Sequence, residues 1–134
     1  MFDWLRKKKE APLTGAPAVR RQKTYSAESG YVYQYFYEGQ RAAERDGSAG
    51  TQYVFSVSSD RKSSGPVSVF LSEQALGSWQ IGHGRQLVST ERYAVAKMAL
   101  FQAFDRRADP SQMNEEVRVM AEDVEAILAT LDIA

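Results

Sequence analysis

The chain has 134 residues, no cysteine, one histidine, and 17 basic and 17 acidic residues. This length suits one domain with a full hydrophobic core. The absence of cysteine excludes disulfides and thiolate chemistry, and a single histidine argues against a zinc or iron–sulfur site. No apolar run is long enough to span a membrane, and the N-terminus turns basic too early for a signal peptide. We expect a cytoplasmic protein without a metal or cofactor.

The charges are unevenly distributed along the chain. Residues 1–24 hold seven basic and two acidic residues and carry +5, so the remainder carries −5. Two prolines and a glycine interrupt any helix in this first segment. We predict that residues 1–24 form a mobile basic arm, and that residues 25–134 form a single α+β domain.

Four tyrosines stand at alternate positions near the start of this domain: Tyr31, Tyr33, Tyr35 and Tyr37. Because side chains alternate between the two faces of a strand, their rings would line one face of a strand over residues 31–40. The residues between them, Val32 and Phe36 among others, would line the opposite face. A one-residue shift in register exchanges the two sets, so the sequence leaves open which set faces the core.

Two further strands are predicted at residues 51–58 and 66–71, after a polar loop at residues 42–50. Alternate positions define one apolar face, formed by Tyr53, Phe55, Val57, Val67, Val69 and Leu71. Short connections between consecutive strands favour an antiparallel meander. Residues 79–81 are a candidate for a fourth strand.

Helices are predicted to follow the strands. Ser72 can cap a short turn that Gly77 would stop, and Ser89 or Thr90 can cap a long helix that ends near Arg107. A second long helix, introduced by Asp109 and Pro110 or capped by Asn114, has one apolar stripe over residues 117–131 and an acidic opposite face. The expected fold is a three- or four-stranded antiparallel meander followed by two long helices packed on one face.

The second face of this sheet carries apolar residues for which the chain offers no further helix. The predicted contact set is Val32, Phe36, Val54 and Phe70, with Tyr31, Tyr33, Tyr35 and Tyr37 as the alternative set. Contiguous exposed apolar patches usually mark contact surfaces. We therefore expect a small non-catalytic interaction module that associates with itself, as a dimer, through this face. The competing interpretation is that these residues are scattered or covered by the arm.

A second hypothesis is a small-anion or nucleotide-binding protein, or an enzyme. His83 stands between two glycines, Arg85 follows it, and Arg92 lies near the start of the long helix. Helix N-termini attract anions through free N–H groups and the helix dipole. No nucleophile or orienting carboxylate accompanies the histidine, so no catalytic residue is assigned and a surface loop is the simpler interpretation.

A third hypothesis gives the arm a function as an adaptor. Apolar residues Phe2, Trp4 and Leu5 precede the basic run Arg6 to Lys9, a pattern that could contact an anionic membrane surface weakly. Aromatic strands can also stack nucleic-acid bases. Residues 25–59 carry −2, however, so the arm alone would have to neutralise the phosphates.

Overall fold

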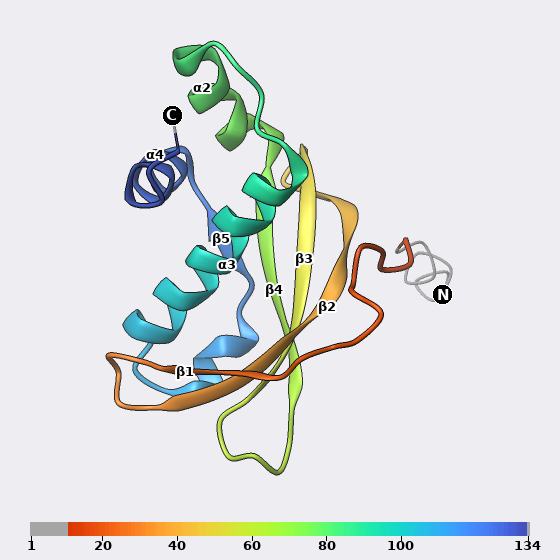
Figure 1. Ribbon diagram of the computed structural model, residues 1–134, viewed down its shortest axis with the longest axis vertical. Coiled ribbons are helices and arrows are strands. Elements are labelled where there is room, and N and C mark those ends of the chain that lie inside the picture. Colours follow the sequence, from red (N-terminus) through yellow and green to blue (C-terminus); the bar gives the residue numbers. More distant parts are fainter. Residues whose placement is uncertain (1–10, 134) are drawn as a thin grey trace.

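The computed structural model describes residues 11–133, which form a curled five-stranded sheet with three α-helices on one side (Figure 1). The strands are β1 (Lys23–Ser26), β2 (Val32–Arg45), β3 (Ser48–Ser58), β4 (Gly65–Ser72) and β5 (Val117–Val119). The helices are α2 (Glu73–His83), α3 (Ser89–Arg106), the 3-10 helix η1 (Pro110–Asn114) and α4 (Ala121–Thr130). The strands lie in chain order; β1 to β4 are antiparallel, and β5 runs parallel to β4. The α+β class and the meander are confirmed, whereas the predicted numbers of strands and helices are wrong.

Strands β2 and β3 form one long hairpin. Its turn is Asp46-Gly47, and both residues have a positive φ, 52° and 79°, as a two-residue type I′ turn requires. Pairing extends from the turn as far as Gln34 opposite Ser58. The predicted loop at residues 42–50 is therefore wrong. Polar side chains on the outer face of the hairpin concealed the continuation of both strands.

The tyrosine row faces the helices, which decides the register that the sequence left open. Tyr33 is 1% exposed, and its ring stacks on Phe104 of α3 with the centroids 4.1 Å apart. The ring centroid of Tyr37 lies 4.8 Å from that of Tyr93 on the same helix. Only Tyr31, at the start of the row, is 38% exposed. The aromatic contacts with α3 thus fix the orientation of β2.

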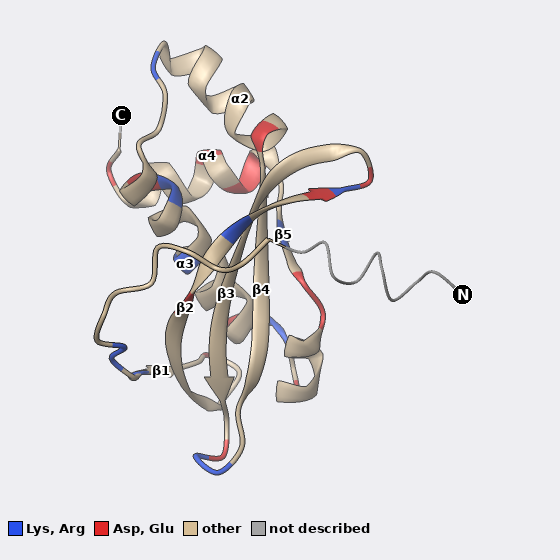
Figure 2. Cartoon of the chain, turned by 90° about the vertical axis from the view of Figure 1, so that its right-hand side faces the viewer, with Lys and Arg blue, Asp and Glu red and all other residues tan. Residues whose placement is uncertain are grey.

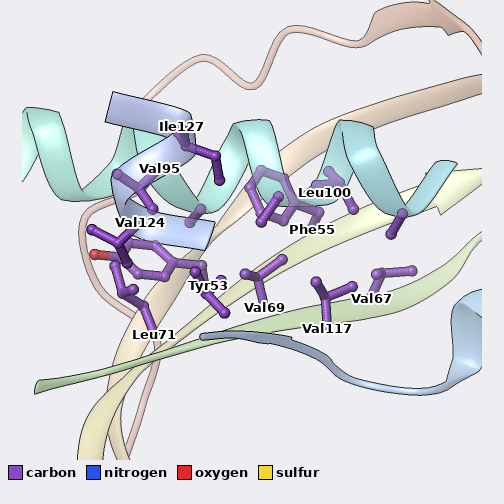
Figure 3. Close-up of a cluster of buried hydrophobic side chains, with 14 of the residues drawn as sticks. Tyr53, Phe55, Val67, Val69, Leu71, Val95, Leu100, Val117, Val124 and Ile127 are labelled. Carbon is purple, nitrogen blue, oxygen red and sulfur yellow. The ribbon is translucent and has the colours of Figure 1, made fainter. Parts of the chain in front are cut away.

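The core lies between the inner face of the sheet and the helices (Figure 3). The apolar face predicted for β3 and β4 is confirmed, because all six of its side chains are buried. From the helices, Val95 and Leu100 of α3 and Val124 and Ile127 of α4 complete the cluster. Helix α4 packs against α2 and α3.

Helix α2 is longer than the sequence predicted. Ser72 does cap it, since its hydroxyl oxygen accepts the Ala75 N–H at 3.0 Å. The helix passes through Gly77 and ends only at Gly84, whose φ is 67°. Burial of Trp79, which is 1% exposed, offsets the roughly 1 kcal/mol that a glycine costs inside a helix. The candidate strand at residues 79–81 is therefore wrong.

The predicted helix over residues 117–131 is divided into two elements. Val117 and Val119 are buried and Arg118 is exposed, which is the alternation of a strand, and this segment adds β5 beside β4. Helix α4 then begins at Ala121, after Met120, whose N–H donates to the Asp123 carboxylate at 2.9 Å. Val117 and Met120 are three residues apart, which is also the spacing of one face of a helix, so the sequence wrongly predicted a helix there.

Candidate functional site

The outer face of the sheet is less apolar and better covered than the sequence predicted. Of the expected contact set, Val54 is 7% and Phe70 is 4% exposed. The Phe70 ring lies across Gly50, so closely that a Cβ added to Gly50 would come within 2.7 Å of the ring. The Arg45 guanidinium lies 5.3 Å from the centroid of the Phe70 ring. Val32 is 41% exposed and Phe36 is half-buried, so these two alone of the four remain accessible.

A polar network occupies the middle of the outer face. The buried Gln52 amide donates to the Ser68 hydroxyl at 2.9 Å and accepts from the Arg41 guanidinium at 2.8 Å. Arg41 also donates to the Ala11 carbonyl at 2.8 Å, which ties the arm to this face. The outer face is thus partly covered by the chain itself, the competing interpretation stated above.

The segment before β1 crosses over β2 on this outer face (Figure 2). Thr14 pairs with Gln40 through two backbone hydrogen bonds, 2.9 Å and 2.8 Å long. The approach is so close that a Cβ on Gly39 would lie 2.9 Å from the Thr14 carbonyl oxygen. Gly39 has a φ of 131° and sits at a bulge in β2, a geometry that glycine tolerates best.

The boundary predicted at residue 24 falls inside β1, which begins at Lys23, so the sheet includes the end of the expected arm. The basic run and the apolar residues before it lie outside the described residues. Contact of residues 1–24 with a membrane or a nucleic acid therefore stays a prediction.

The three predicted anion-binding side chains already contact carboxylates of the chain: His83 with Glu125 at 3.4 Å, Arg85 with Glu91 at 2.9 Å, and Arg92 with Glu73 at 3.1 Å. His83 stacks on Trp79 at 4.2 Å, and the Arg85 guanidinium lies 5.3 Å from a ring centroid of the same tryptophan. His83 and Arg85 are therefore neighbours around Trp79, as the sequence suggested. An added anion would have to displace the carboxylates that they already contact.

A different part of the structure is hollowed, with one side open to solvent. A cavity of about 570 Å³, here called the arm cavity, lies between residues 15–23, the edge of β2 and the start of α3. Its floor consists of the aromatic rings of Tyr35, Tyr37 and Tyr93, and Phe36 between the two strand tyrosines also contributes to the lining. Its rim consists of basic and hydroxyl side chains, from Arg20, Arg21, Lys23, Ser89 and Thr90.

The arm cavity is a consequence of two anchor points. At one end Thr14 pairs with Gln40, and at the other Lys23 pairs with Tyr35. Between them, residues 15–22 of the arm must span the same distance as residues 36–39 of β2. The arm segment is the longer of the two, so it bulges away from the strand and leaves a hollow beneath it.

The tyrosine hydroxyls of the floor are kept neutral. Burial raises the pKa of Tyr37, and the neighbouring Tyr53 and Tyr93 raise it further. Burial likewise raises the pKa of Tyr35 and of Tyr93. The Tyr37 hydroxyl donates to the Gln40 side-chain oxygen at 3.0 Å. The floor therefore offers ring faces and neutral hydroxyls, but no negative charge.

The start of α3 lies at the rim of the cavity. Its N-cap is Val88, whereas the sequence predicted Ser89 or Thr90 as the cap. The Val88 N–H donates to the Glu91 carboxylate at 3.0 Å, which is the half of a capping box that the third helical residue supplies, and no side-chain hydroxyl caps the helix. Ser89 and Thr90 are exposed, and both line the arm cavity.

Comparison of the chain with protein-family models, with curated proteins and with solved structures finds no match. Within residues 11–133, no helix is both long and apolar enough to cross a membrane. The same range holds no cluster of three or more side chains suited to a metal ion. The geometry of the arm cavity is therefore the main guide to function.

The Arg85–Glu91 pair predicts a dependence of stability on pH. The Arg85 guanidinium and the Val88 N–H hold the pKa of Glu91 at about 2, below its ordinary 4.5. A carboxyl whose pKa is lower in the folded chain stabilises the fold above its unfolded pKa, and this contribution is lost as the pH falls toward 2. The free energy of unfolding should therefore fall more steeply below about pH 4.5 in the wild type than in Glu91→Gln.

Urea denaturation at about pH 5 and about pH 3 would measure this difference. The control is Glu122→Gln, at an exposed position in the first turn of α4. Equal acid sensitivity of the wild type and Glu91→Gln would contradict the assignment.

Proposed function

We propose that the protein is a non-catalytic binding module and that its ligand site is the arm cavity. The volume of about 570 Å³ lies within the roughly 300–1,000 Å³ of small-molecule sites. Such sites are lined mainly by apolar and aromatic side chains with a few polar groups, which matches the ring floor and polar rim. The ring-lined hollow beneath the arm is the observation that carries this proposal.

The floor favours a ligand with a flat, apolar body. Aromatic rings pack best in offset or edge-to-face contacts, with centroids roughly 4.5–7 Å apart. The Tyr37 and Tyr93 rings are inclined to each other by 57°. A third ring that stacks on one of them would therefore meet the other closer to edge-to-face. Their rings are further supported from below by Phe55, with centroids 5.4 Å and 6.3 Å away. A preformed platform of this kind needs little reorganisation on binding.

The residues at the site support binding more than catalysis. General acid–base chemistry needs a side chain with a pKa near the working pH and within hydrogen-bond reach of the substrate. The side chains that line the arm cavity are aromatic, basic, hydroxyl, amide and aliphatic, and their tyrosine pKa values are shifted upward. We therefore propose a module that captures a small molecule, acting in the cytoplasm as the sequence led us to expect.

Binding of phenylnaphthylamine, a neutral probe whose fluorescence increases in apolar sites, would test this function. The wild type should bind it, and Thr90→Trp should raise the Kd at least about tenfold, because the indole would fill the cavity from its rim. The matched control is Ser78→Trp, which puts the same ring on an exposed position of α2, away from the cavity. Thermal unfolding of both variants would verify that they fold.

An absence of saturable probe binding by the wild type would refute the proposed function. Equal binding by the two tryptophan variants would show that the probe binds elsewhere, which would refute it as well.

Self-association, as a dimer through the outer face, is retained as a second proposal in a narrower form. Val32 is 41% exposed at one end of this face, and half-buried Phe36 lies on the same face two strand repeats further on. Val54 and Phe70 no longer belong to it, because the chain buries both. Light scattering at high protein concentration should then give a dimer for the wild type and a monomer for Val32→Glu. A monomeric wild type would refute this proposal.

A further inference from the structure

We propose that the ligand of the arm cavity is an anion: a carboxylate, sulfonate or phosphate group joined to a flat apolar body. Arg21 and Lys23 would bind the anionic group at the rim while the tyrosine rings hold the body. This inference rests on the proposed function, and it adds the chemical class of the ligand.

The charge at the rim of the cavity is positive and only partly balanced. Arg20, Arg21 and Lys23 line the cavity, and no carboxylate is among its lining side chains. Arg20 is offset by Glu38, with Nε and Oε1 3.4 Å apart. Within residues 11–133, no carboxylate forms an ion pair with Arg21 or Lys23. An anionic ligand would supply the countercharge that the described chain does not.

Two like charges, on Lys23 and Lys97, interact beside the cavity. Residues opposite each other in a strand pair point to the same face, so Lys23 projects with its partner Tyr35 toward α3. There it meets Lys97, one helical turn beyond Tyr93. Burial lowers the pKa of Lys97, and the ammonium group of Lys23 lowers it further.

Among residues 11–133, Lys97 has weak compensation from the ring of Phe101, whose centroid is 5.8 Å from Nζ, and no ion pair with a carboxylate. Two ammonium groups held together repel each other, and an anion close to both would relieve that repulsion. Lys23 itself lines the cavity, so an anion beside its ammonium group would lie at the rim of the site.

The start of α3 adds a smaller contribution in the same direction. Its first turn exposes the hydroxyls of Ser89 and Thr90 at the rim, and the positive end of the helix dipole points toward the cavity side. The one carboxylate in this turn, Glu91, is bound by the Arg85 guanidinium and the Val88 N–H. Its charge is therefore already neutralised and does not repel an incoming anion.

The test compares two probes that share one ring system. Anilinonaphthalene sulfonate carries an anionic group that phenylnaphthylamine lacks, so the difference in Kd isolates the contribution of the charge. At low salt the sulfonate should bind about fivefold more tightly, and added salt should weaken only this probe. In the double variant Arg21→Gln, Lys23→Gln, the Kd for the sulfonate should rise about fivefold, and that for the neutral probe should stay within about twofold.

The control is Arg61→Gln, Lys62→Gln, which removes two exposed cations from the turn between β3 and β4, away from the cavity. It should leave both affinities unchanged. The anion inference is overturned, while the proposed function stands, if the neutral probe binds and the sulfonate binds no more tightly than it does. The same conclusion follows if the Arg21→Gln, Lys23→Gln variant binds the sulfonate as tightly as the wild type. If neither probe binds, the proposed function fails.

Discussion

The structure depends on the row of aromatic contacts between β2 and α3. Tyr33 stacks on Phe104 at 4.1 Å, and Tyr37 meets Tyr93 at 4.8 Å, so the inner face of the first part of β2, from Tyr33 to Tyr37, is held against the helix. These contacts fix the register of the strand, and they curl the sheet so that β1 and β2 wrap the side of α3 (Figure 1). They also determine which side of the sheet receives the helices and which side is left to the arm.

The arm cavity follows from this arrangement together with one backbone irregularity. The bulge at Gly39 lets the arm approach β2 closely enough for Thr14 to pair with Gln40. The aromatic row at the same time presents Tyr35 and Tyr37 toward α3, where they form the floor of the hollow. A single strand thus supplies an anchor for the arm on one face and the lining of a site on the other. The basic residues of the arm reach the cavity because the chain must return from Thr14 to β1.

Local patterns predicted the elements that depend on local physics. The alternation in β3 and β4, the long helix α3 and the cap at Ser72 were all found. The three-residue strand β5 was missed because Val117 fits a strand and a helical stripe equally well. The arm cavity could not be predicted, since pairing between Thr14 and Gln40 joins distant residues and leaves no local signal in the sequence. The pairing of Arg85 with Glu91 is similar: the sequence shows the charges, and only the fold shows that each neutralises the other.

Residue-resolved hydrogen exchange of the full chain tests the central claim, that the arm is anchored over β2, most directly. The amides of Thr14 and Gln40 donate to each other's carbonyls at 2.9 Å and 2.8 Å. Both should exchange at least about tenfold more slowly than the amides of Val19 and Arg20, in the bulging segment between the anchors. Exchange of Thr14 and Gln40 as fast as that of the bulging segment would show that the arm is not held there, and the cavity would then have no roof.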